Sequence, residues 1–360
     1  MKVALIADAQ WLGQERATLR RIVVGLVDEM VRVVRIAPEP SGDPTEQWLM
    51  SAEPLWYRPT NWGWWRDRQV RAFAPALREM EVDVVHALDG SLDAAACGLS
   101  AALGVPVVCT VWSMAEVGAL RAHGAATTRA YVAGSRGLAE AVRRRVGAGP
   151  TIECVPPGVY AGPDENPHPP LQRVSDSICC VVIGNGRYDG YYRTLLAGIS
   201  KSRQRLPGAM YFFYTTESDQ HQIWQAAEQL DLLEQVSLVP TGADARRLMT
   251  QADVLLQPQP LGAVRTVVLE AMAAARPIIA AADPLVDHLI NGGTARLLRE
   301  PDSEQWAQCL VELAERPGEF AQLGRGARQH VLEHHKASAY SAGLCRLYER
   351  LAVPEAIPFR

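Results

Sequence analysis

The sequence predicts a two-domain α/β protein in which helices cover both faces of two parallel sheets. The chain has 360 residues, which exceeds the length of one ordinary α/β core and suits two. Short apolar runs typical of buried strands alternate with stretches of helical periodicity. A proline-rich segment over 157–177 separates two similar halves and is typical of a linker. We therefore expect an N-terminal domain over 1–165, completed by a C-terminal helix over 338–360, and a second domain over 166–337.

The first half begins with a predicted strand and an amphipathic helix. Residues 2–7 form an apolar run, KVALIA, and a turn is expected around Gly13. Apolar residues then recur at helical spacing over 15–30, and 92–103 is a second helical stretch, rich in small residues. The further strands of this half are expected at 31–37, 83–87, 105–111, 130–133 and 152–155.

The alternation restarts after the linker. Strands are expected at 178–183, 210–215, 236–239, 253–257 and 277–281. Helices are expected at 193–205, 220–230, 243–250, 265–275 and over most of 303–351. Open parallel sheets bind ligands at the carboxyl ends of their strands, so two such sheets predict a ligand cleft between the domains. The fold alone does not fix the chemistry of that cleft.

The composition favours a globular protein and disfavours several partners. Hydrophobic residues make up 48% of the chain, charged residues 21%, and the net charge is −4. This charge supplies no overall positive field for nucleic acid. No apolar run reaches the roughly 18 residues that a membrane-spanning helix needs. The N-terminal segment lacks the charged and apolar regions of a signal peptide and predicts a first strand instead.

The cysteines indicate a reducing location. All seven are scattered without a CxxC pair, and several lie in apolar runs where a thiol acts as a small hydrophobic group. We therefore expect a cytoplasmic protein without a metal site.

The second half carries the most specific pattern. Residues 252–281 read ADVLLQPQPLGAVRTVVLEAMAAARPIIAA. This segment resembles the nucleotide-sugar signature of retaining glycosyltransferases, family 4 (group 1) in particular. Segments at 82–90, 104–112 and 132–142 resemble that family's N-terminal strands and domain-end signature, in the same order. The resemblance covers nearly the whole chain and implies the GT-B fold, in which two Rossmann-like domains face each other across a cleft.

One residue of the family's glutamate pair is present and one is missing. Glu270 matches the second glutamate of the Glu-x7-Glu motif, which accepts hydrogen bonds from the donor ribose. The alternative is an ordinary helix glutamate near the positive end of a helix dipole. Gly262 stands where the first glutamate is expected, and the glycine-rich turn that usually follows is replaced. Arg265 and Thr266 are expected to contact the donor, and Arg265 either adds positive charge for the phosphates or fills their pocket.

The loop after the first strand of the second domain is the expected diphosphate site. It reads IGNGRYDGYYRTLL over 183–196 and has no lysine, unlike most of the family. Arg187 and Arg193 are the available cations, and arginine binds phosphate well. Gly184 and Gly186 would let the phosphates approach the backbone. The alternative is a glycine-rich turn with surface arginines.

In the first domain, Gly13 lies in a segment that resembles the loop near the donor phosphates, and His86 ends a central strand. His86 either bonds a sugar hydroxyl or is a satisfied structural residue. Trp112 replaces a histidine that is frequent in the family, so this position can stack on a sugar but cannot accept a proton. The expected acceptor-binding residues are Trp112, Asp89, Ser135 and Arg136.

One segment is unusual in any context. Residues 60–73 read TNWGWWRDRQVRAF and combine Trp62, Trp64 and Trp65 with Arg66 and Arg68. The segment suits three roles: a stacking surface for a glycan acceptor, a contact with an anionic membrane, or a loop that covers the core of the first domain.

The resemblance implies a retaining glycosyltransferase that moves a hexose-type sugar from a nucleotide donor to a glycan, lipid or small-molecule acceptor, without metal or cofactor. The leaving phosphate itself helps to deprotonate the acceptor in this family, so no carboxylate pair is needed, unlike in glycosidases. Arg187, Arg193 and His86 are the expected catalytic groups. Two alternatives remain open: a non-catalytic relative with a degenerate donor site, and an epimerase of the same fold.

Overall fold

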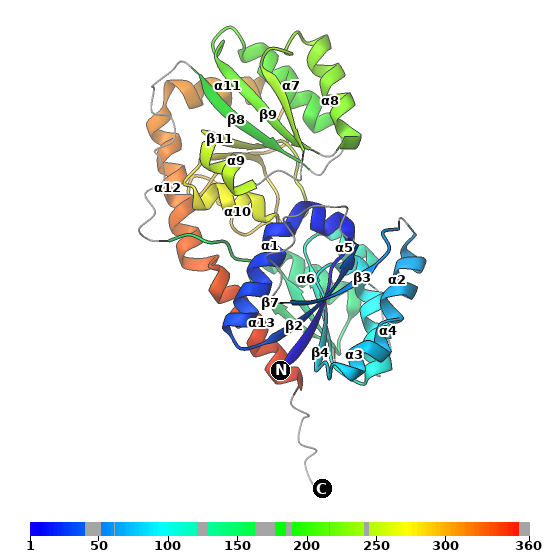
Figure 1. Ribbon diagram of the computed structural model, residues 1–360. Helices are drawn as coiled ribbons and strands as arrows, with labels where there is room; N and C mark the ends of the chain where they lie inside the picture. The colour runs from blue at the N-terminus through cyan, green and yellow to red at the C-terminus, as the bar shows by residue number, and fades with distance from the viewer. Residues whose placement is uncertain are drawn as a thin grey trace. The chain divides into compact units, whose positions relative to one another are not determined.

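The computed structural model describes residues 1–39, 52–60, 62–120, 129–162, 177–184, 189–215, 217–240 and 245–352. The chain divides into two compact units, shown in Figure 1. Unit 1 comprises Met1–Gly158 and Ala337–Arg360, and unit 2 comprises Val159–Lys336. Most of the expected linker, 163–176, lies outside the described residues.

Unit 1 is built on a seven-stranded parallel sheet in the order β3-β2-β1-β4-β5-β6-β7. Its strands are β1 (Lys2–Ile6), β2 (Arg32–Pro38), β3 (Ala52–Tyr57), β4 (Val84–Ala87), β5 (Val107–Val111), β6 (Arg129–Ala133) and β7 (Thr151–Cys154). Its helices are α1 (Ala9–Asp28), α2 (Gly63–Arg71), α3 (Ala74–Glu79), the 3₁₀ turn η2 (Gly90–Leu92), α4 (Asp93–Leu103), α5 (Met114–Ala119), α6 (Arg136–Val146) and α13 (Ala337–Ala352).

Unit 2 is built on a six-stranded parallel sheet in the order β10-β9-β8-β11-β12-β13. Its strands are β8 (Ile178–Ile183), β9 (Ala209–Thr215), β10 (Val236–Pro240), β11 (Val254–Gln257), β12 (Ile278–Ala281) and β13 (Arg296–Leu298). Its helices are α7 (Gly190–Ser202), α8 (Glu217–Gln229), α9 (Ala245–Gln251), α10 (Thr266–Ala273), α11 (Ser303–Glu315) and α12 (Pro317–His334).

The two sheets share one strand order over six strands, with β7 added in unit 1, and this order predicts a candidate ligand site in each. The strand order reverses between β1 and β4 in unit 1 and between β8 and β11 in unit 2. At such a reversal the connections leave in opposite directions and open a crevice at the carboxyl ends of the two strands. Polar groups that follow β1, β4, β8 and β11 are therefore the candidates for function.

Apart from their carboxyl ends, the central strands of both sheets are buried. β1, β4, β5 and β11 are covered almost throughout, and apolar clusters fill both faces of the unit 2 sheet. The C-terminal helix α13 contributes Tyr340, Leu344, Leu347 and Tyr348 to the core of unit 1. The predicted fold class, α/β with parallel sheets covered by helices, is confirmed.

Three features of unit 1 differ from the sequence prediction. β3 was not expected because its sequence, AEPLWY, contains Pro54, but β3 is an edge strand, where the missing backbone donor of a proline is tolerated. The short helices α2, α3 and α5 were not expected either. The turn predicted around Gly13 is wrong: α1 begins at Ala9 because the Asp8 carboxylate caps it by accepting from the backbone N–H of Gln10. The backbone departs from helical geometry only at Glu15.

A matched pair of glycines on α12 tests the packing of unit 2. A Cβ atom at Gly324 would overlap the backbone carbonyl of Ala275, whereas a Cβ at Gly318 meets nothing within 4 Å. Gly324→Ala should therefore lower the free energy of unfolding of unit 2 by about 1–3 kcal/mol. Gly318→Ala should leave it unchanged or raise it slightly, because alanine loses less entropy in a helix. Equal urea midpoints for the two variants would contradict the tight approach of α12.

Candidate functional site

In unit 2, polar groups gather at the carboxyl ends of β8 and β11. Asp189 caps the N-terminus of α7 by accepting from the backbone N–H groups of Tyr191 and Tyr192. Its second oxygen, Oδ2, accepts from Gln259 Nε2 at 2.7 Å. A Cβ on Gly184 would overlap both the Tyr192 hydroxyl and the Gln259 amide oxygen. A larger residue at position 184 would force the ends of these two side chains to move, so packing favours the expected glycine.

A carboxylate that follows the next strand, β12, bonds the backbone of Gly262, which replaces the family's first glutamate. The backbone N–H of Gly262 donates to Asp283 Oδ2 at 2.7 Å, and Leu285 donates to Asp283 Oδ1 at 3.0 Å. Gly262 has a positive φ of 57°, a conformation that L side chains adopt only with strain. A glutamate at this position would therefore need a different backbone. Asp283 closes the turn that leads into α10.

The N-terminal turns of α10 carry three expected donor-binding residues. Arg265 is the N-cap, Thr266 is the first residue of the helix, and Glu270 follows one turn later. The side chain of Glu270 is 4% exposed, so the protein covers nearly all of it. The backbone N–H groups at the N-terminus of a helix, together with its dipole, favour an anion.

The expected diphosphate arginines are only partly described. Arg193 lies in the first turn of α7 and is exposed, and its backbone N–H donates to Asp189 O at 3.2 Å. Arg187 and Gly186 lie outside the described residues. The structure thus supplies one exposed cation at the start of α7.

In unit 1, three carboxylates and one arginine gather at the carboxyl ends of β1, β4 and β5. Arg66, from α2, donates to Asp8 Oδ2 at 2.8 Å and to the carbonyl oxygen of Ser91 at 2.8 Å. Asp89 caps η2 by accepting from the backbone N–H of Ser91 at 2.6 Å. The arginine therefore joins the segments that follow β1 and β4, on both sides of the point where the strand order reverses.

The third carboxylate, Glu116, titrates abnormally. Its Oε2 accepts from the backbone N–H groups of Gly90 and Trp112, each at 3.0 Å, and Ser113 Oγ donates to its Oε1 at 3.0 Å. Burial, and then the nearby Asp89 carboxylate, raise the pKa of Glu116 to about 8. Burial also raises the pKa of Asp89. Glu116 therefore stays largely protonated near neutral pH, because burial disfavours its charged form and the neighbouring Asp89 carboxylate repels that charge.

Two predicted site residues of unit 1 belong to its core instead. His86 is fully buried, and its ring nitrogens are hydrogen-bonded to the Tyr348 hydroxyl at 2.5 Å and to Thr110 Oγ1 at 2.7 Å. Burial lowers its pKa to about 3, which keeps the ring neutral. Trp112 is 4% exposed and donates from Nε1 to the Leu88 carbonyl at 2.7 Å. His86 lies on a central strand covered on both faces and has both ring nitrogens bonded, so its predicted contact with a sugar is corrected. The Trp112 ring packs against Trp11 and Tyr340, and its stacking on a sugar stays a prediction.

The other expected residues of unit 1 lie at the starts of helices. Ser135 is the N-cap of α6 and accepts from the backbone N–H of Leu138 at 3.2 Å. Arg136, the first residue of α6, is exposed. Gly13 lies within α1 rather than in a loop. The predicted phosphate-binding loop at Gly13 is therefore absent, because this residue is helical.

The residues that the sequence prediction missed share one signal. Asp8, Gln259 and Asp283 each stand two positions after the end of a central strand, as does the predicted Asp89. Because parallel strands end at one edge, polar residues at this offset meet there. Glu116 lies further from its strand and gives no comparable signal.

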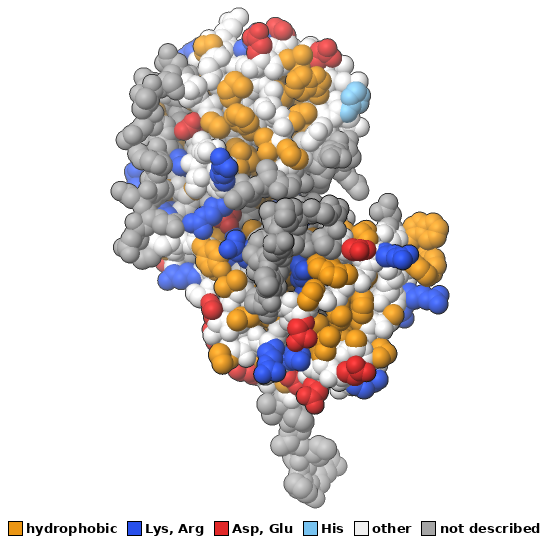
Figure 2. Space-filling model, viewed as in Figure 1, with side chains coloured by type: hydrophobic (Ala, Val, Ile, Leu, Met, Phe, Trp, Pro, Cys, Tyr) orange, Lys and Arg blue, Asp and Glu red, His pale blue; other side chains and the backbone are white. Residues whose placement is uncertain are grey.

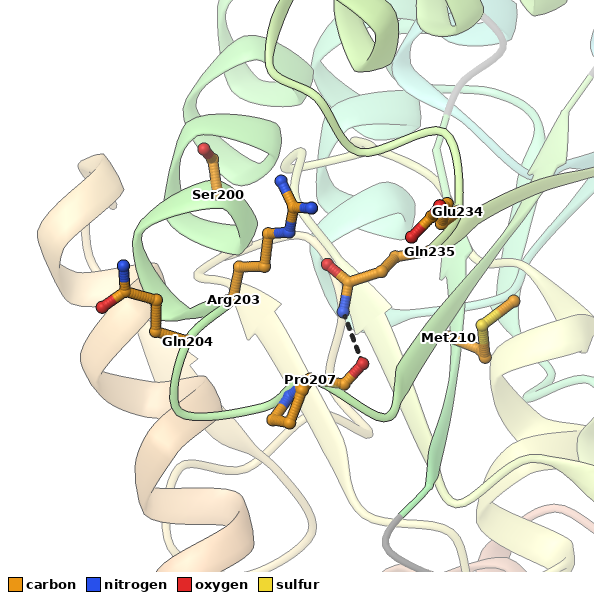
Figure 3. Close-up of a pocket in the computed structure, with 7 residues that line it drawn as sticks. All are labelled: Ser200, Arg203, Gln204, Pro207, Met210, Glu234 and Gln235. Carbon is orange, nitrogen blue, oxygen red and sulfur yellow. Dashed lines mark hydrogen bonds between the residues drawn. The ribbon is translucent and has the colours of Figure 1, made fainter.

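A separate pocket opens at the other end of the unit 2 sheet, beside the amino ends of β9 and β10. Figure 3 shows its lining, and its volume is about 640 Å³. Gln235 Nε2 donates to the carbonyls of Leu206, Pro207 and Ala209, and Arg203 pairs with Asp231. Gln235 and Arg203 are therefore engaged within the protein and give no sign of a substrate in this pocket.

Within the described part of the chain, no cluster of His, Cys, Asp or Glu has the arrangement of a metal site. Among the same residues, no helix is both long and apolar enough to cross a bilayer.

Two family descriptions match the sequence, one in each half of the chain. The family described as Glycosyltransferase Family 4 matches residues 13–161, and that described as Glycosyl transferases group 1 matches residues 173–316. The protein belongs to the group 1 / family 4 glycosyltransferases. The Family 4 match lies almost entirely in unit 1, and the group 1 match lies in unit 2. A search of curated proteins finds no match.

Solved structures agree on the fold. A glycosyltransferase from Rickettsia africae ESF-5 has a TM-score of 0.74 at 12% identity, covering 98% of this chain and 99% of its own. Anabaena Alr3699/HepE, solved with UDP and glucose, has a TM-score of 0.73 at 15% identity, covering 98% and 100%. Sucrose-phosphate synthase from Thermosynechococcus elongatus has a TM-score of 0.69 at 17% identity, covering 98% and 99%. At such identities the likeness shows the shared GT-B fold alone.

The raised pKa of Glu116 predicts a specific dependence of stability on pH. In the unfolded chain this carboxyl ionises near its ordinary pKa of 4.5, whereas the folded protein keeps it protonated up to about pH 8. Between these values the folded state holds a proton that the unfolded state has lost, so this group lowers the free energy of unfolding as the pH rises. Glu116→Gln, which stays neutral, should gain stability relative to the wild type from pH 5 to pH 8, by at most about 1.4 kcal/mol per pH unit.

Denaturant unfolding of both proteins across this pH range measures the difference. A difference that stays constant with pH would show that Glu116 is ionised in the folded state.

Proposed function

We propose that the protein is a retaining glycosyltransferase that moves a hexose from a nucleotide diphosphate sugar to a glycan, lipid or small-molecule acceptor. The observation that carries this proposal is the site at the carboxyl ends of β8 and β11, where the family signature supplies the N-terminus of α10. The backbone N–H groups at that helix N-terminus, together with the helix dipole, favour an anion such as a diphosphate.

On this proposal, Glu270 binds the donor ribose through its carboxylate, which can only accept hydrogen bonds while it is ionised. Arg187 and Arg193 neutralise the diphosphate, and Thr266 and the α10 N-terminus contact its oxygens. Arg265 adds positive charge at the N-cap of the same helix. The complex of Anabaena Alr3699/HepE with UDP and glucose supports a uridine nucleotide as the first donor to test.

The transfer exchanges one glycosidic bond for another. The bond between the anomeric carbon and the diphosphate oxygen breaks, and the acceptor oxygen bonds to the same face of that carbon. The acceptor proton passes to the leaving phosphate. The protein's contribution is electrostatic, because the arginines and the helix N-terminus stabilise the charge that develops on the diphosphate.

Unit 1 is the proposed acceptor side. Asp89 lies at its strand-order reversal, beside Asp8 and Arg66, and Arg136 is exposed at the start of α6. Carboxylates accept hydrogen bonds from sugar hydroxyls, which gives an acceptor glycan or headgroup a means of orientation. The cytoplasmic location of the protein stays a prediction.

A second candidate function is a non-catalytic protein that binds a nucleotide or sugar. Gly262, with its positive φ and its bond to Asp283, favours this candidate, since the turn lacks the family's first glutamate. The two functions differ in turnover: the enzyme releases nucleoside diphosphate from its donor, and the binding protein does not.

Nucleotide binding tests the proposed donor site. In a titration with UDP, GDP and ADP, the wild type should bind one of them and should show a raised melting temperature. Glu270→Gln should weaken that binding about 10- to 100-fold, because hydrogen bonds to a charged group contribute about 1.5–3 kcal/mol. Glu304→Gln, the same substitution at an exposed position of α11, is the matched control and should bind normally.

Calorimetry and thermal unfolding give both readouts. Equal affinities for Glu270→Gln and Glu304→Gln would contradict the ribose role, and a wild type that binds no nucleotide would contradict the donor site altogether.

A further inference from the structure

Three neighbouring tryptophans are exposed on unit 1. Trp62, Trp64 and Trp65, at the start of α2, are 66%, 61% and 40% exposed. Figure 2 shows hydrophobic side chains together with Lys and Arg at the edge of unit 1 where Figure 1 draws α2. We call these three residues and the neighbouring Arg58 and Arg68 the tryptophan surface. Large aromatic side chains in such a group are seldom left in water without a partner.

The surface rests on a fixed support, so its exposure is not the result of a loose helix. Arg66 holds α2 to Asp8 and Ser91, as described above. Gln69 bonds the backbone of Arg58 in both directions, at 2.9 and 3.1 Å. Val70 is buried. One face of α2 therefore packs on the rest of unit 1, and the tryptophans lie on its exposed side. Of the three roles considered for this segment, a cover for the core of the first domain is the one that this exposure disfavours.

The rings contact one another in a way that leaves little room for a sugar. Trp62 and Trp64 stack with centroids 6.0 Å apart, and Trp65 meets Trp64 edge-on at 5.5 Å. Arg68 lies over the Trp65 ring at 5.5 Å. A sugar-binding platform needs an open ring face with hydroxyl-binding groups around it, whereas Trp64 contacts both of the other tryptophan rings and the neighbouring Arg58 and Arg68 are cations.

The charges around the rings suit a phosphate-bearing surface. Arg58 and Arg68 are exposed, while the only carboxylate of α2, Asp67, is paired with Arg66 at 3.2 Å. Tryptophan prefers the interface between lipid and water, and arginine is attracted to anionic headgroups. The chain is acidic overall, with a net charge of −4, so this positive charge is local.

We propose that the tryptophan surface docks unit 1 on an anionic lipid bilayer. Trp62, Trp64 and Trp65 enter the headgroup region, and Arg58 and Arg68 contact lipid phosphates. This names a partner for the protein that does not depend on sugar transfer. It also predicts that the carboxylate edge of unit 1, tied to α2 through Arg66, works close to the membrane.

Vesicle binding of the full chain tests the proposal. The wild type should float with vesicles of phosphatidylcholine and phosphatidylglycerol, and it should bind pure phosphatidylcholine much more weakly. Replacing the three tryptophans by alanine should lower the partition coefficient at least about tenfold. Arg68→Ala should lower it about fivefold, an effect that disappears at high salt.

The matched control is Trp224→Ala, which removes an exposed tryptophan of unit 2 and should bind vesicles as the wild type does. Melting temperature and nucleotide affinity are measured on every variant, so that a failure of membrane docking is separate from a failure of the donor site. The single variant Trp64→Ala replaces the triple variant if that protein does not fold.

Three outcomes would overturn the proposal. The wild type does not bind anionic vesicles at low salt, or Trp224→Ala weakens binding as much as the triple variant does. In the third outcome, the triple variant binds vesicles normally but loses another interaction. Loss of self-association would assign the surface to a second copy of the chain, and loss of glycan binding would assign it to a sugar.

Discussion

Each unit buries both faces of a parallel sheet beneath helices, and this constraint decides where polar chemistry can lie. A strand covered on both sides has no open face, so a side chain within it must be apolar or satisfied internally. His86 shows the second case: it sits on β4 with both ring nitrogens bonded and its pKa lowered by burial. Reactive or binding groups are thereby confined to the segments that follow the strands, and the reversal of strand order gathers them at one place in each unit.

The two edges that result offer different groups to a ligand. In unit 2 the N-terminus of α10 and the exposed Arg193 favour an anion, while the carboxylates of Asp189 and Asp283 are bonded within the protein. In unit 1 the edge combines Asp8, Asp89, Glu116 and Arg66, and burial, followed by the neighbouring carboxylates, raises the pKa of Glu116 and Asp89. A negatively charged donor and a hydroxyl-bearing acceptor are the ligands that these edges would favour, which is the division of labour that we propose.

The sequence predicts the fold well because the strands are long apolar runs and the family pattern is spread over the whole chain. It fails where a contact is set by a distant residue. β3 is tolerated only as an edge strand, and the ring nitrogens of His86 are bonded by Thr110 and by Tyr348 from the C-terminal helix. The early start of α1 is a different case, because its cap, Asp8, is a local signal that the sequence prediction missed. The missing glutamate at Gly262 was visible in the sequence, but the carboxylate of Asp283 beside it was not, since it comes from the next strand. The exposure of the tryptophans likewise depends on Arg66 and Gln69 holding α2 in place.

The central claim is that the donor binds at the carboxyl edge of the unit 2 sheet. Hydrogen–deuterium exchange of the full chain, with and without the nucleotide diphosphate that binds it, tests this most directly. We expect protection from exchange in the segments around 183–193 and 258–270, which follow β8 and β11. Protection instead at 203–210 and 234–235, which line the pocket at the amino ends of β9 and β10, would contradict the account.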